Sequence, residues 1–320
     1  MMKQLSGMMG GRALAEILEG TVNPSGKLPT TWAKDYWDYP SAKNFLTRKD
    51  VKTRYPDTAV NYLTTVYEEG LYVGYRYFDT ASLYGTERAL GQAVKESVAE
   101  SGLDRKNLFI VSKLWTDEMG YHEAKKAFER SLERLQMDYL DMYLIHWPKQ
   151  SEDDNAWKER SMETWLAMEE LCMAGKIKGL GLSNFLPHHM DVILDNCNIK
   201  PMVNQLEVHP GYTQEAAIRY CQERDILVQA WSPLGRQRVL EEPLLIELAA
   251  KYDVTPAQIC LRFLLQRGIN PIPKASSFER MRNNMDIFDF SITTEDMHRL
   301  NTLPQTGWSG EHPDFERVMI

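Results

Sequence analysis

Four side chains with complementary chemistry end or follow short apolar runs of this sequence: Asp79, Tyr84, Lys113 and His146. A free phenol has a pKa of about 10, and a neighbouring cation lowers that pKa toward working pH. Lys113 can be such a cation for Tyr84, and Asp79 can keep Lys113 charged and oriented. His146 can hydrogen-bond the oxygen that Tyr84 protonates. The set therefore predicts a site that donates a proton to a carbonyl oxygen and stabilises the charge developing there.

These residues belong to a regular alternation of short apolar runs and amphipathic helices. Segments such as ERALGQAVKESVAE and YHEAKKAFERSLERLQ carry apolar residues along one helical face. Seven strands are predicted, at residues 77–80, 108–113, 139–146, 179–183, 202–207, 226–231 and 270–274. Strands that alternate with helices through short loops are typical of parallel βαβ units. The pattern predicts an α/β protein one strand short of a (β/α)₈ TIM barrel.

The predicted barrel explains why the polar residues are spread along the chain. A (β/α)₈ barrel builds its active site from the C-terminal ends of its strands, where residues distant in sequence meet. Each residue alone has a plain structural explanation, as a packing tyrosine, a solvated lysine or a histidine in a turn. Four complementary groups on successive strand ends favour the chemical interpretation. A doubly wound sheet is the alternative fold, but no GxGxxG motif follows any strand.

Composition and charge exclude several classes of function. The 320 residues are 43% hydrophobic and 26% charged, as in an ordinary globular protein. A net charge of -8 disfavours a nucleic-acid partner, and no apolar run reaches the ~20 residues of a membrane span. The four cysteines form no CxxC pair, which favours free thiols over a metal site. We expect a cytoplasmic monomer with no metal ion.

Seven segments resemble the signature segments of the aldo-keto reductase family, in the family's order: FDTASLYG, IVSKLW, YLDMYLIHWP, KGLGLSNF, NQLEVHP, AWSPLG and IPKASSFERMRNN. The resemblance runs from about residue 74 to the end of the chain. It implies a (β/α)₈ barrel that binds NADPH without a Rossmann fold and reduces a small aldehyde, ketone or keto-sugar. It also implies that Asp79, Tyr84, Lys113 and His146 are the catalytic residues, with Tyr84 as the proton donor.

The same resemblance implies which residues bind the cofactor and the substrate. The cofactor residues lie at or after four of the later strands: Ser183, Asn184, Gln205, Trp231, Ser232, Leu234, Lys274, Ser277, Arg280 and Asn284. The first three match positions that bind the nicotinamide carboxamide, and Trp231 falls where an aromatic ring stacks on the nicotinamide. Ser232 and Leu234 match the pyrophosphate loop, and the last four lie around the 2′-phosphate. The substrate residues are expected to be His146, Trp115 and Trp147.

The first 70 residues do not continue the alternation of short apolar runs and amphipathic helices. GGRALAEILEGTVNPSGKLPTTWAKDYWDYPSAKNF and YEEGLYVGYRYFD resemble the C-terminal domain of family 3 β-glucosidases, over about residues 8–79. The two resemblances overlap at GYRYFDT, and we expect a fusion of a segment 1–70 to a barrel 71–320. A divergent native first βα unit is the alternative. The missing first strand would leave a gap between the strands that carry Asp79 and Lys274. The sequence leaves open whether LPTTW forms a strand that fills this gap.

Besides a carbohydrate-binding role for the short N-terminal segment, which rests only on its many aromatic residues, two functional interpretations stay open. The first is an active NADPH-dependent carbonyl reductase. The second is a cofactor-binding barrel, or a fusion product, with little or no catalytic activity. No glycosidase activity is implied, because no pair of carboxylates is placed for acid and nucleophile roles.

Overall fold

The computed structural model describes residues 76–101, 104–275 and 277–315. The segment 1–70, with its possible substitute strand LPTTW, lies outside the described residues. No helix in the described ranges is long and apolar enough to cross a membrane.

The seven predicted strands are present and form one parallel sheet in the order of the chain. They are β1 (Tyr77–Asp79), β2 (Phe109–Leu114), β3 (Met142–Ile145), β4 (Leu180–Ser183), β5 (Val203–Glu207), β6 (Leu227–Trp231) and β7 (Asn270–Pro271). Within the described residues, β1 and β7 are the two ends of the sheet. The sheet curls as in a (β/α)₈ barrel whose first unit is partly missing, which confirms the predicted fold class.

Some strands end earlier than predicted. The last one stops at Pro271 instead of residue 274, because Pro271 and Pro273 have no N–H group to donate to a ladder. Ile272 still donates a hydrogen bond to the Ala230 carbonyl at 2.9 Å, so the chain follows β6 for one further residue.

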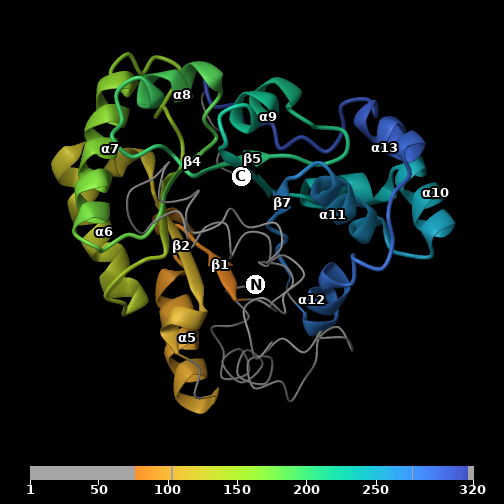
Figure 1. The fold of residues 1–320 in the computed structure, drawn as a ribbon, viewed down its shortest axis with the longest axis horizontal. Helices are drawn as coiled ribbons and strands as arrows, with labels where there is room; N and C mark the ends of the chain where they lie inside the picture. Colours follow the sequence, from red (N-terminus) through yellow and green to blue (C-terminus); the bar gives the residue numbers. More distant parts are fainter. Residues whose placement is uncertain (1–75, 102–103, 276, 316–320) are drawn as a thin grey trace, which may run out of the picture.

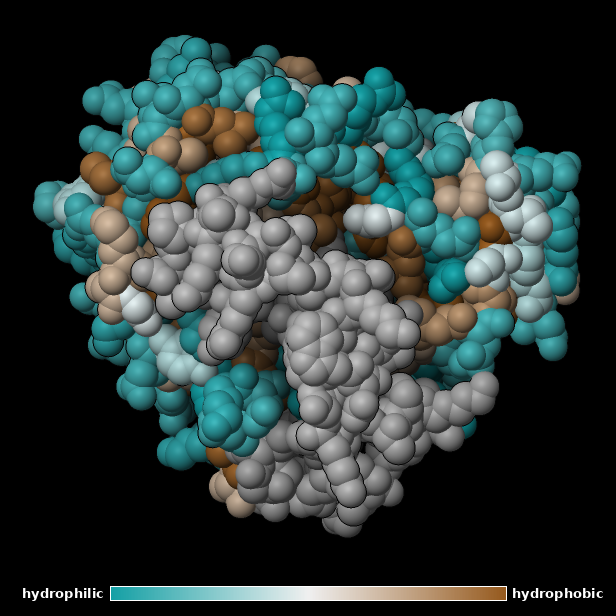
Figure 2. All heavy atoms as spheres, viewed as in Figure 1, coloured by the Kyte–Doolittle hydropathy of each residue, from teal (hydrophilic) through white to brown (hydrophobic). Residues whose placement is uncertain are grey.

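Nine α-helices of the described chain lie around the outside of the strands (Figure 1). They are α5 (Glu87–Ser101), α6 (Tyr121–Leu135), α7 (Trp157–Met173), α8 (Pro187–Leu194), α9 (Glu215–Gln222), α10 (Pro243–Tyr252), α11 (Pro256–Gln266), α12 (Phe278–Met285) and α13 (Thr294–Asn301). Their ends follow local chemistry: α11 begins with Pro256, and Thr255 accepts a hydrogen bond from the Gln258 N–H. Figure 2 shows a mostly hydrophilic outer surface, with hydrophobic residues gathered toward the centre of this face.

Alternation along the strands divides the interior into an apolar and a polar layer. Successive side chains of a strand point to opposite faces, and one face carries the buried cluster Phe109, Val111, Met142, Leu144 and Val203. The next positions along the same face hold Lys113, Gln205 and Gln229. The polar layer therefore lies at the C-terminal ends of the strands, where the predicted site belongs.

Candidate active site

Lys113 and Asp79 form a buried ion pair across neighbouring strands. Lys113 lies on β2 two residues beyond Val111, which is opposite Asp79 at the end of the parallel pairing of β1 with β2. The Lys113 side chain is 1% exposed, and Nζ donates to Asp79 Oδ1 and to the Thr80 carbonyl at 3.0 Å. A cation buried to this extent must be paired and hydrogen-bonded, and both conditions are met here.

Tyr84 and His146 lie beside that pair. Tyr84 ends the 3₁₀ turn Ser82–Tyr84 that follows β1, and its hydroxyl is 3.2 Å from Nε2 of His146, which follows β3. Lys113 Nζ is 5.1 Å from the centroid of the Tyr84 ring. Gly85 reverses the chain after the turn with a φ of 65°. The four predicted catalytic side chains are therefore brought together.

The pKa of Tyr84 differs from the expectation. Burial raises the pKa of the phenol and the charge of Lys113 lowers it, while Asp79 raises it again, and the net pKa lies above the ordinary value. Half of the side chain is exposed, but the hydroxyl lies against His146, so desolvation still outweighs the cation. Lys113 therefore lowers the Tyr84 pKa as predicted, but its effect is smaller than that of burial, so the net pKa stays above the ordinary value.

Lys113 itself is held in its charged form. Burial lowers the pKa of its ammonium group, but Asp79 and Tyr84 together outweigh burial and raise the net pKa above the ordinary value. Tyr84 is therefore a protonated phenol beside the charged ammonium group of Lys113. It can act as an acid toward a group that accepts its proton.

Amide and aromatic side chains join the ends of β3, β4 and β6. Asn184 donates through Nδ2 to the His146 carbonyl at 3.0 Å and to Ser183 Oγ at 3.1 Å. Its Oδ1 accepts a hydrogen bond from Trp231 Nε1 at 2.8 Å. Because both Nδ2 hydrogens are used within the protein, Asn184 has only the second lone pair of Oδ1 left for a ligand.

Three tryptophan rings border this group. Trp115 lies edge-on to His146 with centroids 5.0 Å apart, and Trp147 lies edge-on to Trp231 at 6.4 Å. Trp115 is thus in ring contact with a predicted catalytic residue, and Trp147 with the predicted stacking residue.

The Aldo/keto reductase family model matches residues 52–304 of this sequence. The chain belongs to the aldo-keto reductase family. The glyoxal reductase of Bacillus subtilis is 44% identical over 241 residues, which cover 75% of this chain and 83% of that protein.

Solved aldo-keto reductases share the fold. The crystal structure of an aldo/keto reductase from Brucella melitensis is 38% identical, with a TM-score of 0.66 over 74% of this chain and 87% of that chain. An aldo-keto reductase solved in complex with NADPH is 33% identical, with a TM-score of 0.69 over 82% of this chain and 83% of that chain.

A second family matches the start of the sequence. The Glycosyl hydrolase family 3 C-terminal domain model covers residues 1–75 and overlaps the reductase match at residues 52–75. Both resemblances expected from the motifs are therefore confirmed, and a fusion of two genes would produce this pair of matches.

The predicted cofactor residues of this aldo-keto reductase fall into two groups. Ser183, Asn184, Gln205 and Trp231 share the hydrogen-bonded centre with the catalytic residues, and Ser232 and Leu234 continue the loop after β6. The others lie on the segment from β7 into α12: Lys274, Ser277, Arg280 and Asn284. The first three of these are exposed and Asn284 is buried. Ser277 is the N-cap of α12 and accepts a hydrogen bond from the Arg280 N–H at 3.3 Å.

The sequence analysis did not predict two residues of the interior network, Tyr77 and Gln229. Gln205 Nε2 donates to Asp79 Oδ2 at 2.7 Å and to Gln229 Oε1 at 2.9 Å. Gln229 in turn lies against the Tyr77 hydroxyl, with Tyr77 donating to Oε1 at 3.0 Å and accepting from Nε2 at 2.8 Å. The sequence contained a signal for both residues. Tyr77 lies two residues before Asp79, and Gln229 lies two residues before Trp231, so each shares a strand face with a predicted site residue.

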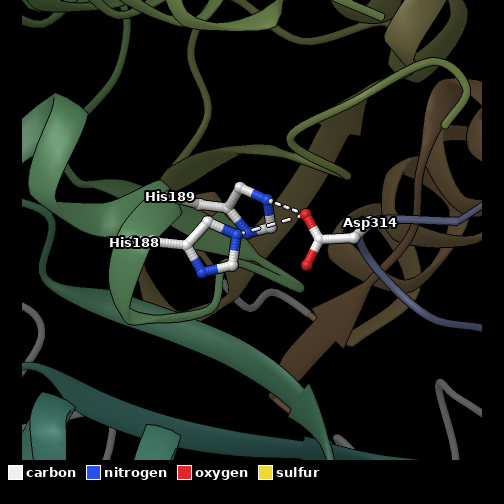
Figure 3. A group of neighbouring side chains, drawn as sticks. All are labelled: His188, His189 and Asp314. Carbon is white, nitrogen blue, oxygen red and sulfur yellow. Dashed lines mark hydrogen bonds and ion pairs between the residues drawn. The ribbon is translucent and has the colours of Figure 1, made fainter. Parts of the chain in front are cut away.

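A histidine cluster outside this centre anchors the C-terminal segment (Figure 3). His188 and His189 both contact Asp314 Oδ1, at 3.1 and 2.9 Å. His189 Nδ1 accepts the Leu186 N–H at 3.1 Å, and burial lowers the His189 pKa to about 4, so the neutral ring carries its proton on Nε2. That proton occupies the lone pair a metal would need, and Lys149 Nζ lies 4.0 Å from the same carboxylate. The cluster is therefore explained as an attachment of the tail to α8.

Proposed function

We propose that this chain reduces a small aldehyde or ketone to an alcohol with NADPH. The observation that carries the proposal is the buried Lys113–Asp79 pair beneath the Tyr84–His146 contact, at the C-terminal ends of three neighbouring strands. Bound NADPH would supply the hydride for the carbonyl carbon, and the protein would supply the proton for the oxygen.

The interior amides fit the nicotinamide end of the cofactor. A carboxylate only accepts hydrogen bonds, so the Nε2 group of Gln205 must face Asp79. Its second hydrogen goes to Gln229, which leaves Gln205 Oε1 as an acceptor for the NH₂ of a carboxamide. Trp231 offers a ring for stacking, and its orientation is set by the bond to Asn184.

The other end of the cofactor carries a phosphate, for which cations are suited. Lys274 and Arg280 are proposed to bind the 2′-phosphate, with Ser277 and Asn284 beside them. Two cations favour a dianionic phosphate strongly over a ribose hydroxyl, and this supports NADPH over NADH. Ser232 and Leu234 are proposed to contact the pyrophosphate.

Proton transfer follows from the four catalytic side chains. Tyr84 is protonated at neutral pH, because its pKa is raised, and it is proposed to give its proton to the carbonyl oxygen. His146 hydrogen-bonds the same oxygen, and the charge on Lys113 stabilises the phenolate that remains. Asp79 keeps Lys113 charged and in place. Trp115 and Trp147 are proposed to contact the substrate, and the relative named glyoxal reductase supports a small aldehyde as its class.

A cofactor titration combined with a turnover assay tests this function. Three tryptophans lie in the candidate site, so NADPH is expected to quench the tryptophan fluorescence of the full chain, and NADPH is expected to be consumed when a simple aldehyde such as glyoxal is added. Quenching without consumption for a panel of small aldehydes and ketones would favour the alternative, a cofactor-binding barrel. No quenching at all would contradict both.

A further inference from the structure

We propose that Tyr77 and Gln229 are positioning residues that set the direction of the Gln205 amide and thereby the recognition of the cofactor's carboxamide. The inference rests on the proposed function. Neither residue is expected to touch the reacting atoms. Both act through Gln205 and Asp79, to which hydrogen bonds connect them.

The network crosses the interior instead of following the sheet. Tyr77 lies on β1 and Gln229 on β6, and four strands separate β1 from β6 in the sheet. The bonds between Tyr77 and Gln229, and between Asp79 and Gln205, therefore join opposite walls of the barrel. Phe109 stacks on the Tyr77 ring with centroids 5.2 Å apart and planes 11° apart, which holds the phenol in place.

The charge of Asp79 fixes the orientation of each amide in turn. Gln205 must present Nε2 to Asp79, and its remaining Nε2 hydrogen requires an acceptor, which is Gln229 Oε1. Gln229 consequently presents Nε2 to the Tyr77 hydroxyl. Burial and the nearby Asp79 raise the pKa of Tyr77 well above its ordinary value, so this hydroxyl stays protonated. A single hydrogen-bond pattern results, and it leaves Gln205 Oε1 unpaired for a ligand donor.

Removal of Gln229 is expected to loosen this pattern without removing any group that meets the cofactor. Gln229 is fully buried, so replacement by methionine keeps the volume and deletes the acceptor. Gln205 would then keep its bond to Asp79 but lose Gln229 Oε1 as the acceptor of its second Nε2 hydrogen, so its Oε1 would no longer have one direction. Tyr77→Phe deletes only the hydroxyl at the end of the network and is expected to have the same effect more weakly.

Discrimination between two cofactors measures this effect. NADPH is compared with its 3-acetylpyridine analogue, in which a methyl group replaces the NH₂ that Gln205 Oε1 would accept from. The ratio of kcat/KM for the two cofactors is expected to favour NADPH by about fivefold or more in the unmodified chain, the value of one hydrogen bond. Gln205→Leu sets the ratio expected when the acceptor is absent. Gln229→Met is expected to approach that ratio, and Tyr77→Phe to lie between the two.

A matched control separates positioning from stability. Gln258→Met also removes a buried amide, but from α11, where its Nε2 bonds the Asp286 carbonyl. This variant is expected to lower the thermal midpoint of unfolding without changing the ratio of kcat/KM for the two cofactors. The inference is overturned if Gln229→Met and Tyr77→Phe keep the ratio of the unmodified chain, whatever their thermal midpoints. If the unmodified chain shows no turnover with NADPH, the proposed function fails instead, which is a distinguishable result.

Discussion

Among single residues, the sequence predicted the four side chains that lie together in the candidate site, but not all of their partners. Asp79, Tyr84, Lys113 and His146 each end or follow a strand, so a local pattern identifies them. Tyr77 shares a strand face with Asp79, but its contact with Gln229, 152 positions away, depends on the curvature of the barrel and could not be predicted from the sequence. The direction of the net Tyr84 pKa shift could not be predicted from the sequence either, because it depends on how far the phenol is desolvated.

Lys113 is predicted to contribute to stability as well as to chemistry. Lys113→Met leaves Asp79 as a nearly buried carboxylate without its cation, and loss of one partner of a buried pair costs about 3–5 kcal/mol. Urea unfolding at pH 8 measures the free energy of unfolding. Arg88→Ala is the control, because it removes the charge of an exposed side chain of α5. It is expected to change the free energy of unfolding by less than about 0.5 kcal/mol.

The same site predicts how stability depends on pH. The pKa values of Lys113 and Tyr84 are raised in the folded chain, so the folded state binds more protons than the unfolded state at high pH. Their contribution is complete below the unfolded pKa values, about 10, and is lost as pH rises through the folded values. The free energy of unfolding is expected to fall above about pH 10, less steeply when Tyr84→Phe and Lys113→Met are combined. Equal slopes for the two chains would contradict this assignment.

At the scale of secondary-structure elements, periodicity predicted the helices well and their contacts poorly. The predicted helix ERALGQAVKESVAE is α5, and Leu90 and Val94 of its apolar face are buried as expected. Gly91, next to them, lies against the C-terminal end of α6. A Cβ at this position would lie 2.1 Å from the Leu135 carbonyl oxygen. No sequence pattern of α5 alone contains that distance, because it depends on the packing of two helices.

Gly91→Ala is therefore expected to destabilise the protein although alanine favours helices. The added methyl group must push the α6 C-terminus away, at a cost of about 1–3 kcal/mol. Chemical denaturation of the variant against the unmodified chain measures the loss. A gain in stability, as helix propensity alone would give, would show that the two helices separate without cost.

At the scale of the whole molecule, the open side of the sheet is the main structural question. In the described part of the chain, nothing pairs β1 with β7, and unpaired strand edges are templates for association. The number of strands predicted that one strand is missing, and the family resemblance implied where the gap falls. We propose that residues 1–70 form a segment separate from the barrel 71–320, and that the full chain is a monomer.

Deletion of residues 1–70 tests this division. If the barrel is a unit of its own, the shortened chain is expected to fold and to bind NADPH with the affinity of the full chain, and light scattering coupled to size-exclusion chromatography is expected to show a monomeric full chain. A shortened chain that does not fold, or that no longer binds NADPH, would contradict the division.

Proton donation by Tyr84 is tested by the rate of NADPH oxidation by the full chain with a small aldehyde, before and after Tyr84→Phe. This substitution removes only the hydroxyl that faces His146. The proposed role of Tyr84 predicts that kcat falls by about 10²–10⁴-fold, while the Kd for NADPH from fluorescence quenching stays within about twofold. An unchanged kcat in a folded variant that binds NADPH normally would contradict proton donation by Tyr84.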